Sequence, residues 1–375
     1  MAVRYITVTP VTKLFKPATR AFGDIAIVGA AEDEAKGPKK IPVPITNPDS
    51  VSHPSNPEGK DQPVDDAEWF KGDLGKSIRK AFAQTPGPTT VWAVRTDPAD
   101  DGNSLSNAFT EVAKLDVQIV ALANAPLKSA TEGKTEIEAL ADHVGTVSKT
   151  GGDGKERIGV AMLGKGVTDT SIITGDMSID RMVMIAHKSD DDAAAAVAGT
   201  IAGYEPHISL LLKQVKIGME ELFSDAEMEA FDKARVNWLT DPSLLPGKGL
   251  FMGEGYTLGA DIPYLDSRRE LDDISFRLKA ALIRSIGDLR VSRTGLRTLV
   301  SQMTAVLEPL KQREVIEGYD VFIPLLVLLD KEPADLTDAE LQQINNAQNA
   351  RVVDAIVSVD YAGAIHRLNI TLKFV

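Results

Sequence analysis

Short apolar segments alternate with amphipathic segments from Val91 to Ala202, and this alternation constrains the fold more than any other feature of the chain. The apolar segments have the length of buried strands, and the segments between them have the spacing of helices. We predict strands at 91–95, 117–122, 157–162 and 181–186, and helices at 105–115, 137–147 and 191–202. Such alternation is typical of a mostly parallel sheet with helices against its faces.

The regions on either side of this core have other patterns. Residues 3–9 favour a strand, 22–30 a short buried strand, and 32–66 a long irregular connection rich in Pro, Lys, Asp and Ser. A short strand is expected at 250–252. The run 321–329 is interpreted as a buried strand that Pro324 breaks.

Helical signals dominate the second half of the chain. A single apolar stripe predicts one long helix and consists of Leu271, Ile274, Leu278, Leu282, Ile286 and Leu289. Another helix is expected at 296–310. Two capping boxes, Ser224 with Glu227 and Thr337 with Glu340, predict the starts of two further helices.

The last residues of the sequence alternate strictly between apolar and polar side chains. Leu368, Ile370, Leu372 and Phe374 point to one side, and Asn369, Thr371 and Lys373 point to the other. This period of two predicts a half-buried strand, and a similar pattern predicts another strand within 353–361. Because a free strand edge attracts another strand, the terminal segment is expected to pair with the chain's own sheet or with a neighbouring subunit.

Composition excludes several classes of protein. A chain of 375 residues that is 43% hydrophobic can bury a large core and form two or more domains. Its net charge of −13 argues against a nucleic-acid partner. The absence of cysteine excludes disulfides, thiolate metal sites and cysteine nucleophiles. The first residues lack the apolar core of a signal peptide, and no apolar run is long enough to span a bilayer, so we expect assembly in the cytoplasm and no membrane partner.

No motif in the sequence predicts catalysis, a cofactor or a metal. The segment Gly72–Ser77 resembles a phosphate-binding loop only superficially, because Phe70 stands where such a loop needs glycine. The five histidines lack metal-ligand spacing, and the acidic run 190–192 is better explained as the N-terminal cap of a helix. Asp272 and Asp273 are expected on a solvated helix face. The chain is therefore not expected to be an enzyme.

Basic residues are concentrated between Arg268 and Arg297 in this otherwise acidic chain. On a helical wheel, Arg277 and Arg284 lie opposite the apolar stripe. Two interpretations stay open: a solvated helix balanced by nearby acidic residues, or a surface that docks an acidic partner.

Several segments, taken in order, resemble the tail sheath proteins of contractile phage tails and related contractile injection systems. They are Val91–Arg95 with the helix after it, Asp116–Leu122, Phe223–Glu229, Arg235–Asn237, Gly247–Met252, Gly255–Leu258, Tyr264–Ile274 and Leu336–Val375. The resemblance covers most of the chain from Val91 onward and the N-terminal strand. Residues 32–66 match no part of the family, and the short chain implies few outer decorating domains.

The resemblance implies a structural subunit that polymerises into a helical tube around an inner tail tube and contracts to drive it through a target envelope. The implied fold is α/β (α+β overall), with a mostly parallel sheet flanked by helices and with N- and C-terminal strand arms. Its implied parts are an N-terminal assembly arm (1–20), a β and irregular segment with a long loop (21–90), an α/β core (91–260), a helical and β part of a C-terminal sheath domain (261–350), and C-terminal strands with an arm (351–375).

The family's arms complete a sheet shared between neighbouring subunits, which is assembly by β-augmentation. The resemblance implies that the linking residues are Tyr5, Ile6, Val8, Leu368, Ile370, Leu372 and Phe374. We further predict that the tube is contacted either by the Arg268–Arg297 region, through Arg277 and Arg284, or by the short helix after Thr337, through Glu340. The implied partners are further copies of the chain, the inner tail tube protein, and the baseplate and tail terminator proteins. The particle would be the tail of a bacteriophage or archaeal virus that ejects its genome, or a cell-derived injection device.

Two alternatives to a sheath remain open. A soluble enzyme with a Rossmann-like sheet would bind a small molecule beyond the strand ends, near Arg95, Asn124 or Leu163. The second alternative is an assembly protein that polymerises without contracting.

Overall fold

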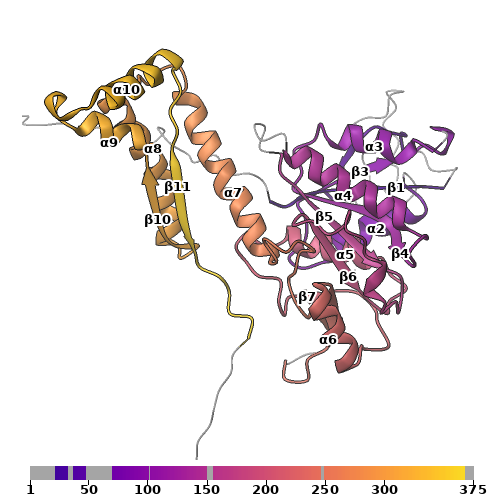
Figure 1. Cartoon of the computed structure of the whole chain (residues 1–375). Helices are drawn as coiled ribbons and strands as arrows, with labels where there is room; N and C mark the ends of the chain where they lie inside the picture. Colours follow the sequence, from indigo (N-terminus) through magenta and orange to yellow (C-terminus); the bar gives the residue numbers. More distant parts are fainter. Residues whose placement is uncertain are drawn as a thin grey trace, which may run out of the picture. The chain divides into compact units, whose positions relative to one another are not determined.

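The computed structural model describes residues 22–32, 37–47, 70–100, 102–149, 155–245 and 249–367. Contacts divide these residues into two compact units. Residues 22–272 and 363–367 form what we call the α/β unit, and residues 273–362 form the helix–ribbon unit (Figure 1).

The described strands of the α/β unit form one nine-stranded sheet in the order β2-β3-β1-β4-β5-β6-β8-β9-β7. Strands β3, β1, β4, β5, β6 and β8 pair in parallel, and β2, β9 and β7 add antiparallel ends. This confirms the predicted mostly parallel sheet. The strands are β1 (Asp24–Gly29), β2 (Val43–Ile45), β3 (Thr90–Arg95), β4 (Ile119–Leu127), β5 (Ile158–Leu163), β6 (Met182–Ala186), β7 (Gln214–Val215), β8 (Asn237–Thr240) and β9 (Leu250–Met252).

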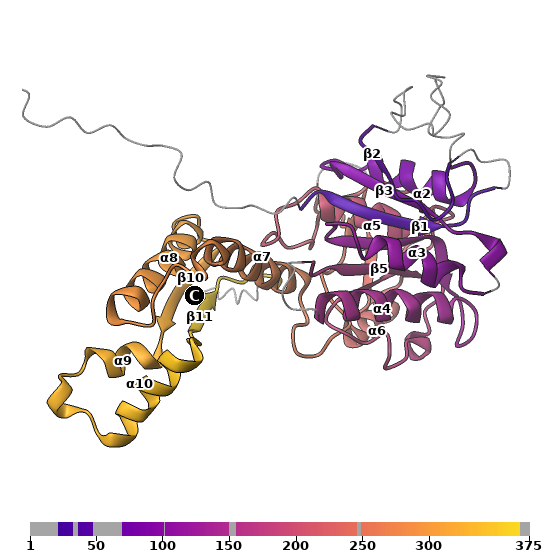
Figure 2. The same ribbon diagram turned by 90° about the horizontal axis from the view of Figure 1, so that it is seen from above.

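Helices cover both faces of this sheet (Figure 2). One face packs against α2 (Asp73–Phe82) and α5 (Ala193–Ala202), and the other against α3 (Ser104–Val112), α4 (Lys134–Lys149) and α6 (Asp225–Ala234). The central strands are buried on both sides, which explains why their sequences are continuous apolar runs. Helix α5 is buried along its whole length, and its small alanine side chains allow this close packing.

Two parts of the α/β unit differ from the sequence prediction. The segment that resembles a phosphate-binding loop forms the start of α2, a helix that was not predicted, and Gly72 precedes it with a φ of 102° that favours glycine. The connection 32–66 is not irregular throughout, because β2 lies within it and pairs antiparallel with β3. A three-residue strand is too short to leave an alternating pattern in the sequence.

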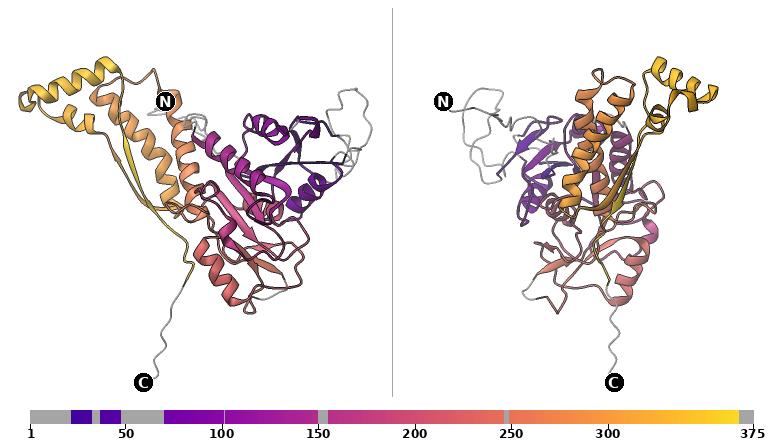
Figure 3. Two further views of the ribbon diagram at one scale, coloured as in Figure 1. Left: turned by 45° about the vertical axis from the view of Figure 1, so that its right-hand side comes forward. Right: turned by 90° about the vertical axis from the view of Figure 1, so that its left-hand side faces the viewer.

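The helix–ribbon unit consists of helices and an antiparallel two-stranded ribbon (Figure 3). Its elements are the end of α7 (Leu265–Leu282), α8 (Arg293–Gln312), β10 (Ile316–Phe322), α9 (Pro324–Asp330), α10 (Asp338–Ala350) and β11 (Ile356–Tyr361). Helix α7 starts in the α/β unit, to which Asp272 and the residues before it belong.

Two predictions in this unit are wrong. The long helix does not continue to Leu289: α7 ends at Leu282, a 3-10 turn follows at Ile283–Ser285, and Ile286 is 78% exposed. Gly287, with a φ of 93°, supplies the left-handed conformation that often ends helices. The run 321–329 is not a broken strand, because β10 ends at Phe322 and α9 begins at Pro324. Proline suits the first helical position, where its missing N–H needs no partner.

The predicted helix starts are confirmed. Ser224 with Glu227 and Thr337 with Glu340 form complete capping boxes at α6 and α10. Asp192 caps α5 by accepting a hydrogen bond from the amide of Ala195, as the acidic run suggested. None of the helices in the described part of the chain combines the length and the apolar character needed to cross a bilayer.

Candidate assembly surface

The residues predicted to link subunits lie outside the described ranges. They are Tyr5, Ile6, Val8, Leu368, Ile370, Leu372 and Phe374. Their role stays a prediction.

The β10–β11 ribbon is anchored to helices on one face only. Its register places Tyr319 opposite Val359 and Val321 opposite Val357. These four side chains pack on the core that Leu307 and other residues of α7, α8 and β10 form. The alternation predicted within 353–361 therefore reflects one covered face.

The other face of the ribbon, and its edges, remain open within the described residues. Phe322 and Ile356, paired across the strands, are 44% and 54% exposed. Neither outer edge has a strand partner among the described residues. A two-stranded ribbon is only marginally stable by itself, and open edges accept further strands. The described residues thus leave both outer edges of the ribbon without a strand partner.

The three residues predicted to contact a tube are not joined by any of the described contacts. Arg277 donates to Asp273 at 2.6 Å on α7 and is largely covered, whereas Arg284 is exposed in the turn after α7. Glu340 completes the α10 capping box and lies 2.6 Å from the ammonium of Lys331. That ammonium, with the hydrogen bonds of the cap, lowers the pKa of Glu340 to about 2.

Asp272 is buried rather than solvated, which corrects the sequence expectation. Its carboxylate accepts two hydrogen bonds from Arg181, at 2.7 and 2.9 Å, and one from Arg268 at 2.5 Å. Arg268 also donates to Asp180 at 2.8 Å. The first turns of α7 belong to the α/β unit, and there Arg181, which precedes β6, reaches Asp272 beside Arg268 of the same helix. A helical wheel places Arg268 next to Asp272, but it does not show Arg181.

The strand ends at which a Rossmann-like enzyme would bind its ligand carry structural hydrogen bonds. Arg95 donates to two backbone carbonyls of the segment before β2, at 2.9 and 3.1 Å. The amide of Asn124 donates to Asp192 at 2.8 Å, and the carbonyl of Leu163 accepts from Nε2 of His187 at 3.0 Å.

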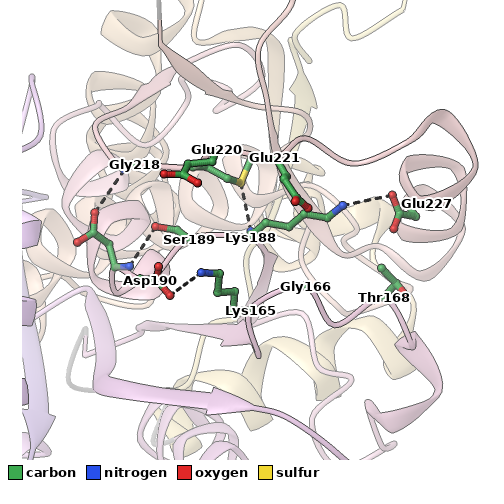
Figure 4. Close-up of a pocket in the computed structure, with 12 residues that line it drawn as sticks. Lys165, Gly166, Thr168, Lys188, Ser189, Asp190, Gly218, Glu220, Glu221 and Glu227 are labelled. Atoms are coloured by element: carbon green, nitrogen blue, oxygen red, sulfur yellow. Dashed lines mark hydrogen bonds and ion pairs between the residues drawn. The ribbon is translucent and has the colours of Figure 1, made fainter.

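Two pockets open beside these strand ends, and charged pairs line both. The first, of about 780 Å³, contains the ion pair of Lys165 with Asp190 at 2.6 Å, and Lys188 at 3.8 Å from Glu227 (Figure 4). Four of its charged lining residues are exposed, Lys165 with Asp190, Glu220 and Glu221, so acids outnumber lysines at this surface.

The second pocket, of about 460 Å³, lies where α2 approaches the N-terminus of α5. There the Ser77 hydroxyl donates to Asp192 at 2.5 Å, and Lys80 pairs with Asp191 at 2.7 Å. Asp192 is already the cap of α5, so its carboxylate is committed to structure. Across the described residues, no group of three or more His, Asp or Glu side chains has an arrangement that would hold a metal ion.

One cluster that sequence reasoning missed does have the connectivity of a hydrolytic triad. Nε2 of His366 lies 2.9 Å from Oγ of Ser209, and Nδ1 lies 2.7 Å from Oε2 of Glu254. The hydrogen bond that Nδ1 makes to the carboxylate of Glu254 raises the pKa of His366, because it stabilises the charged ring. Oγ of Ser209 also accepts from the amide of Leu211 at 3.2 Å, and this hydroxyl is therefore bound as an acceptor.

No signal in the sequence pointed to this cluster. His366 is one of the five histidines whose spacing in the sequence predicts no metal site. Its partners lie 157 and 112 residues earlier in the chain, and only folding brings them together.

Comparisons with known proteins place this fold among sheath proteins. No family model matches the sequence, and no curated protein matches it significantly. The sheath of the PVC extracellular contractile injection system, in its contracted state, superimposes with a TM-score of 0.65 at 13% identity, covering 100% of this chain and 98% of that one. The contracted helical sheath of the anti-feeding prophage gives 0.64 at 14% identity, with coverage of 100% and 99%.

A third solved structure, the sheath tail protein Lin1278 from Listeria innocua, gives a TM-score of 0.56 at 12% identity, covering 92% of this chain and 96% of that one. At such identities the likeness is one of fold, and it extends along nearly the whole of each chain. The similarity inferred from ordered sequence segments is confirmed at this level. The chain has the fold of contractile sheath proteins.

Proposed function

We propose that this chain is the sheath subunit of a contractile tail or injection particle. It would polymerise into a helical tube around an inner tube and contract to drive that tube through a target envelope. The observation that carries this proposal is the full-length likeness to sheaths solved in the contracted state. Contraction requires an extended lattice that is metastable relative to one with stronger contacts between subunits.

The β10–β11 ribbon is, in this proposal, the acceptor of strands from neighbouring copies. Tyr5, Ile6 and Val8 would act in the N-terminal arm, and Leu368–Val375 would form the C-terminal arm. Each backbone hydrogen bond contributes about 0.5–1.5 kcal/mol net, so a strand that makes about four gains a few kcal/mol. Such links would hold subunits together while their rigid parts reorient.

The partners follow from the same proposal. Besides further copies of the chain, they are the inner tube protein and the baseplate and terminator proteins, in the tail of a phage or archaeal virus or in a cell-derived particle assembled in the cytoplasm. Nucleic acid and membrane are not among them, and the role requires no catalysis. Arg277, Arg284 and Glu340 are the proposed tube contacts.

Negative-stain microscopy of the purified chain tests the proposal. We expect long hollow helical tubes whose formation depends on protein concentration. Discrete small oligomers at high concentration would contradict a sheath role. Tubes of one invariant diameter and pitch, under every condition that shortens related sheaths, would favour an assembly protein that does not contract.

Co-assembly with the inner tube protein tests the proposed tube contacts. Arg284→Glu should weaken co-sedimentation of sheath and tube, because Arg284 is exposed and has no partner among the described contacts to absorb the change. Arg297→Glu is the matched control, since Arg297 already pairs with Asp330 at 2.9 Å. Equal co-sedimentation of both variants and the parent chain removes Arg284 from the interface.

A further inference from the structure

After β11 the chain returns to the α/β unit, and residues 363–367 are held there by side chains from separate segments. His366 lies among Ser209, Glu254 and Tyr264. Both ring nitrogens are in hydrogen-bond contact, with Ser209 at 2.9 Å and with Glu254 at 2.7 Å. The ring packs edge-on against Tyr264, with centroids 4.8 Å apart. The side chains of His366 and Glu254 are only 9% and 6% exposed.

Arg367 adds a second attachment beside the first. Its guanidinium donates to Oδ1 of Asp232 on α6 at 2.7 Å, and the Tyr256 hydroxyl donates to the same oxygen at 2.7 Å. A further carboxylate oxygen, of Glu254, lies 3.8 Å away. Because Arg367 is largely exposed, this attachment contributes less than the buried one at His366.

The predicted C-terminal arm follows these contacts directly in the sequence, because its alternating segment starts at Leu368. The contacts therefore hold to the α/β unit the residues that immediately precede the predicted arm. Release of residues 363–367 from their contacts would lengthen the connection between the α/β unit and the predicted arm by up to about 17 Å. A longer tether lowers the effective concentration of the arm at its acceptor.

We propose that His366 and Arg367 form a clamp that holds the root of the C-terminal arm to the α/β unit, with protonated His366 as its buried pin. The geometry of the clamp stands by itself; its role in assembly rests on the proposed sheath function. Loss of the proton from His366 loosens the clamp and frees the root of the arm.

The charged groups around His366 determine the direction of this pH dependence. The hydrogen bond to Glu254 is the largest cause that raises the pKa of His366, and the charges of Glu254 and Asp266 act the same way. Burial and the charge of Arg367 oppose them, and the ring of Tyr264 packs edge-on against the imidazole. Since the folded pKa is above the unfolded value, the stabilisation is complete below about pH 6.5 and is lost as the pH rises through the folded pKa.

Tryptic cleavage of the full-length, unassembled chain measures how often the clamp opens. Trypsin cuts after Arg367, and mass spectrometry follows the loss of residues 368–375. His366→Phe keeps a ring beside Tyr264 but removes both hydrogen bonds, and Glu254→Gln removes the carboxylate charge. A buried hydrogen bond to a charged group is strong enough that each variant should be cut about tenfold faster or more.

The matched control is His207→Phe. His207 also lies beside a glutamate of the α/β unit, Glu205 at 3.7 Å, but this pair is more exposed. Its substitution should leave the rate of cleavage after Arg367 unchanged. A comparable acceleration in this control would mean that the cleavage rate reports a general loosening of the α/β unit. That result would overturn the proposal of a clamp.

A pH titration of the histidine ring signals by NMR tests directly whether His366 holds its proton as the proposal requires. His366 of the parent chain should titrate above pH 6.5. The Glu254→Gln variant keeps the His366 ring, and the titration of that ring should move to lower pH. A ring that titrates at or below pH 6.5 in the parent chain contradicts the proposal, even where a variant fails to fold. Covalent labelling of Ser209 by a fluorophosphonate would also overturn it, in favour of a hydrolytic site.

Microscopy separates failure of the clamp from failure of the sheath role. If the parent chain forms tubes, His366→Phe should form fewer at a given concentration, and tube yield should fall as the pH rises from 6 to 9. If no form of the chain makes tubes while cleavage and titration behave as expected, the sheath role fails and the clamp stands. If tubes form but cleavage and titration do not respond, the clamp fails alone.

Discussion

Asp272 shows how burial makes a single carboxylate a structural requirement. It neutralises Arg181 and Arg268, and all three side chains are largely buried. Asp272→Ala leaves the buried guanidinium of Arg181 without its carboxylate partner, while Arg268 keeps Asp180, so we expect a loss of about 3–5 kcal/mol in the free energy of unfolding. Urea denaturation measures it. The control Glu229→Ala, in the exposed pair with Lys233, should cost about 0–1 kcal/mol. Similar losses in the two variants would contradict the importance of burial.

His143 carries a pH dependence of the opposite sign to that of His366. It stacks on Phe109, and burial, with a smaller effect of Arg157, lowers its pKa to about 3. The unfolded chain therefore binds a proton that the folded chain does not, and stability falls as the pH drops from about 6.5 toward 3. At pH 4.5 this amounts to about 2–3 kcal/mol. His143→Gln should lose less stability than the parent between pH 7 and 4.5 in urea titrations; parallel losses would contradict the assignment.

At the scale of elements, the helix starts combine sequence signals with local hydrogen bonds. Thr337 caps α10 by accepting a hydrogen bond from the amide of Glu340. Thr337→Ala should destabilise this helix by about 0.5–2 kcal/mol, because an amide of the first turn loses its partner. Hydrogen exchange in residues 338–350 measures the change. Thr298→Ala, within α8 and exposed, is the control and should leave exchange there unaltered. Equal protection of α10 in both variants would show that the cap is dispensable.

The element scale also shows where sequence patterns mislead. The stripe from Leu271 to Leu289 has helical spacing throughout, yet Gly287 and the turn before it end the helix at Leu282. Residues 324–330 are apolar and resemble a strand, but Pro324 begins a helix there. Spacing reports which side chains can share a face; it does not report whether the backbone continues in one conformation.

At the scale of the molecule, the proposed sheath role predicts that the terminal segment links folded chains into a polymer. Deleting residues 368–375 should leave the circular dichroism of the chain intact and abolish tube formation, because the described sheet is complete without this segment. An unfolded truncated chain would mean that the segment belongs to its own core.

A pair of point variants tests the same segment without a deletion. Ile370→Asp places a charge on the apolar side of the predicted strand, and Asn369→Asp places the same charge on its polar side. The first should prevent tubes and the second should allow them in microscopy. Equal behaviour of the two would exclude a strand with one covered face.

The sequence by itself determined what depends on neighbours along the chain. Buried strands between Val91 and Ala186 were evident as continuous apolar runs, and the caps at Ser224 and Thr337 were evident because a capping box joins residues three apart. The ordered set of these signals was sufficient for the α/β class and for the likeness to sheath proteins. Each of these features is an interaction of short range, which periodicity and spacing record.

Only the tertiary structure decided the features that join distant segments. The pairing of β2 with β3, the contact of Arg181 with the buried Asp272, and the contacts of His366 with Glu254 and Ser209 have no counterpart in local spacing. Their energies depend on burial and on which charges meet. Those quantities exist only once the chain has folded.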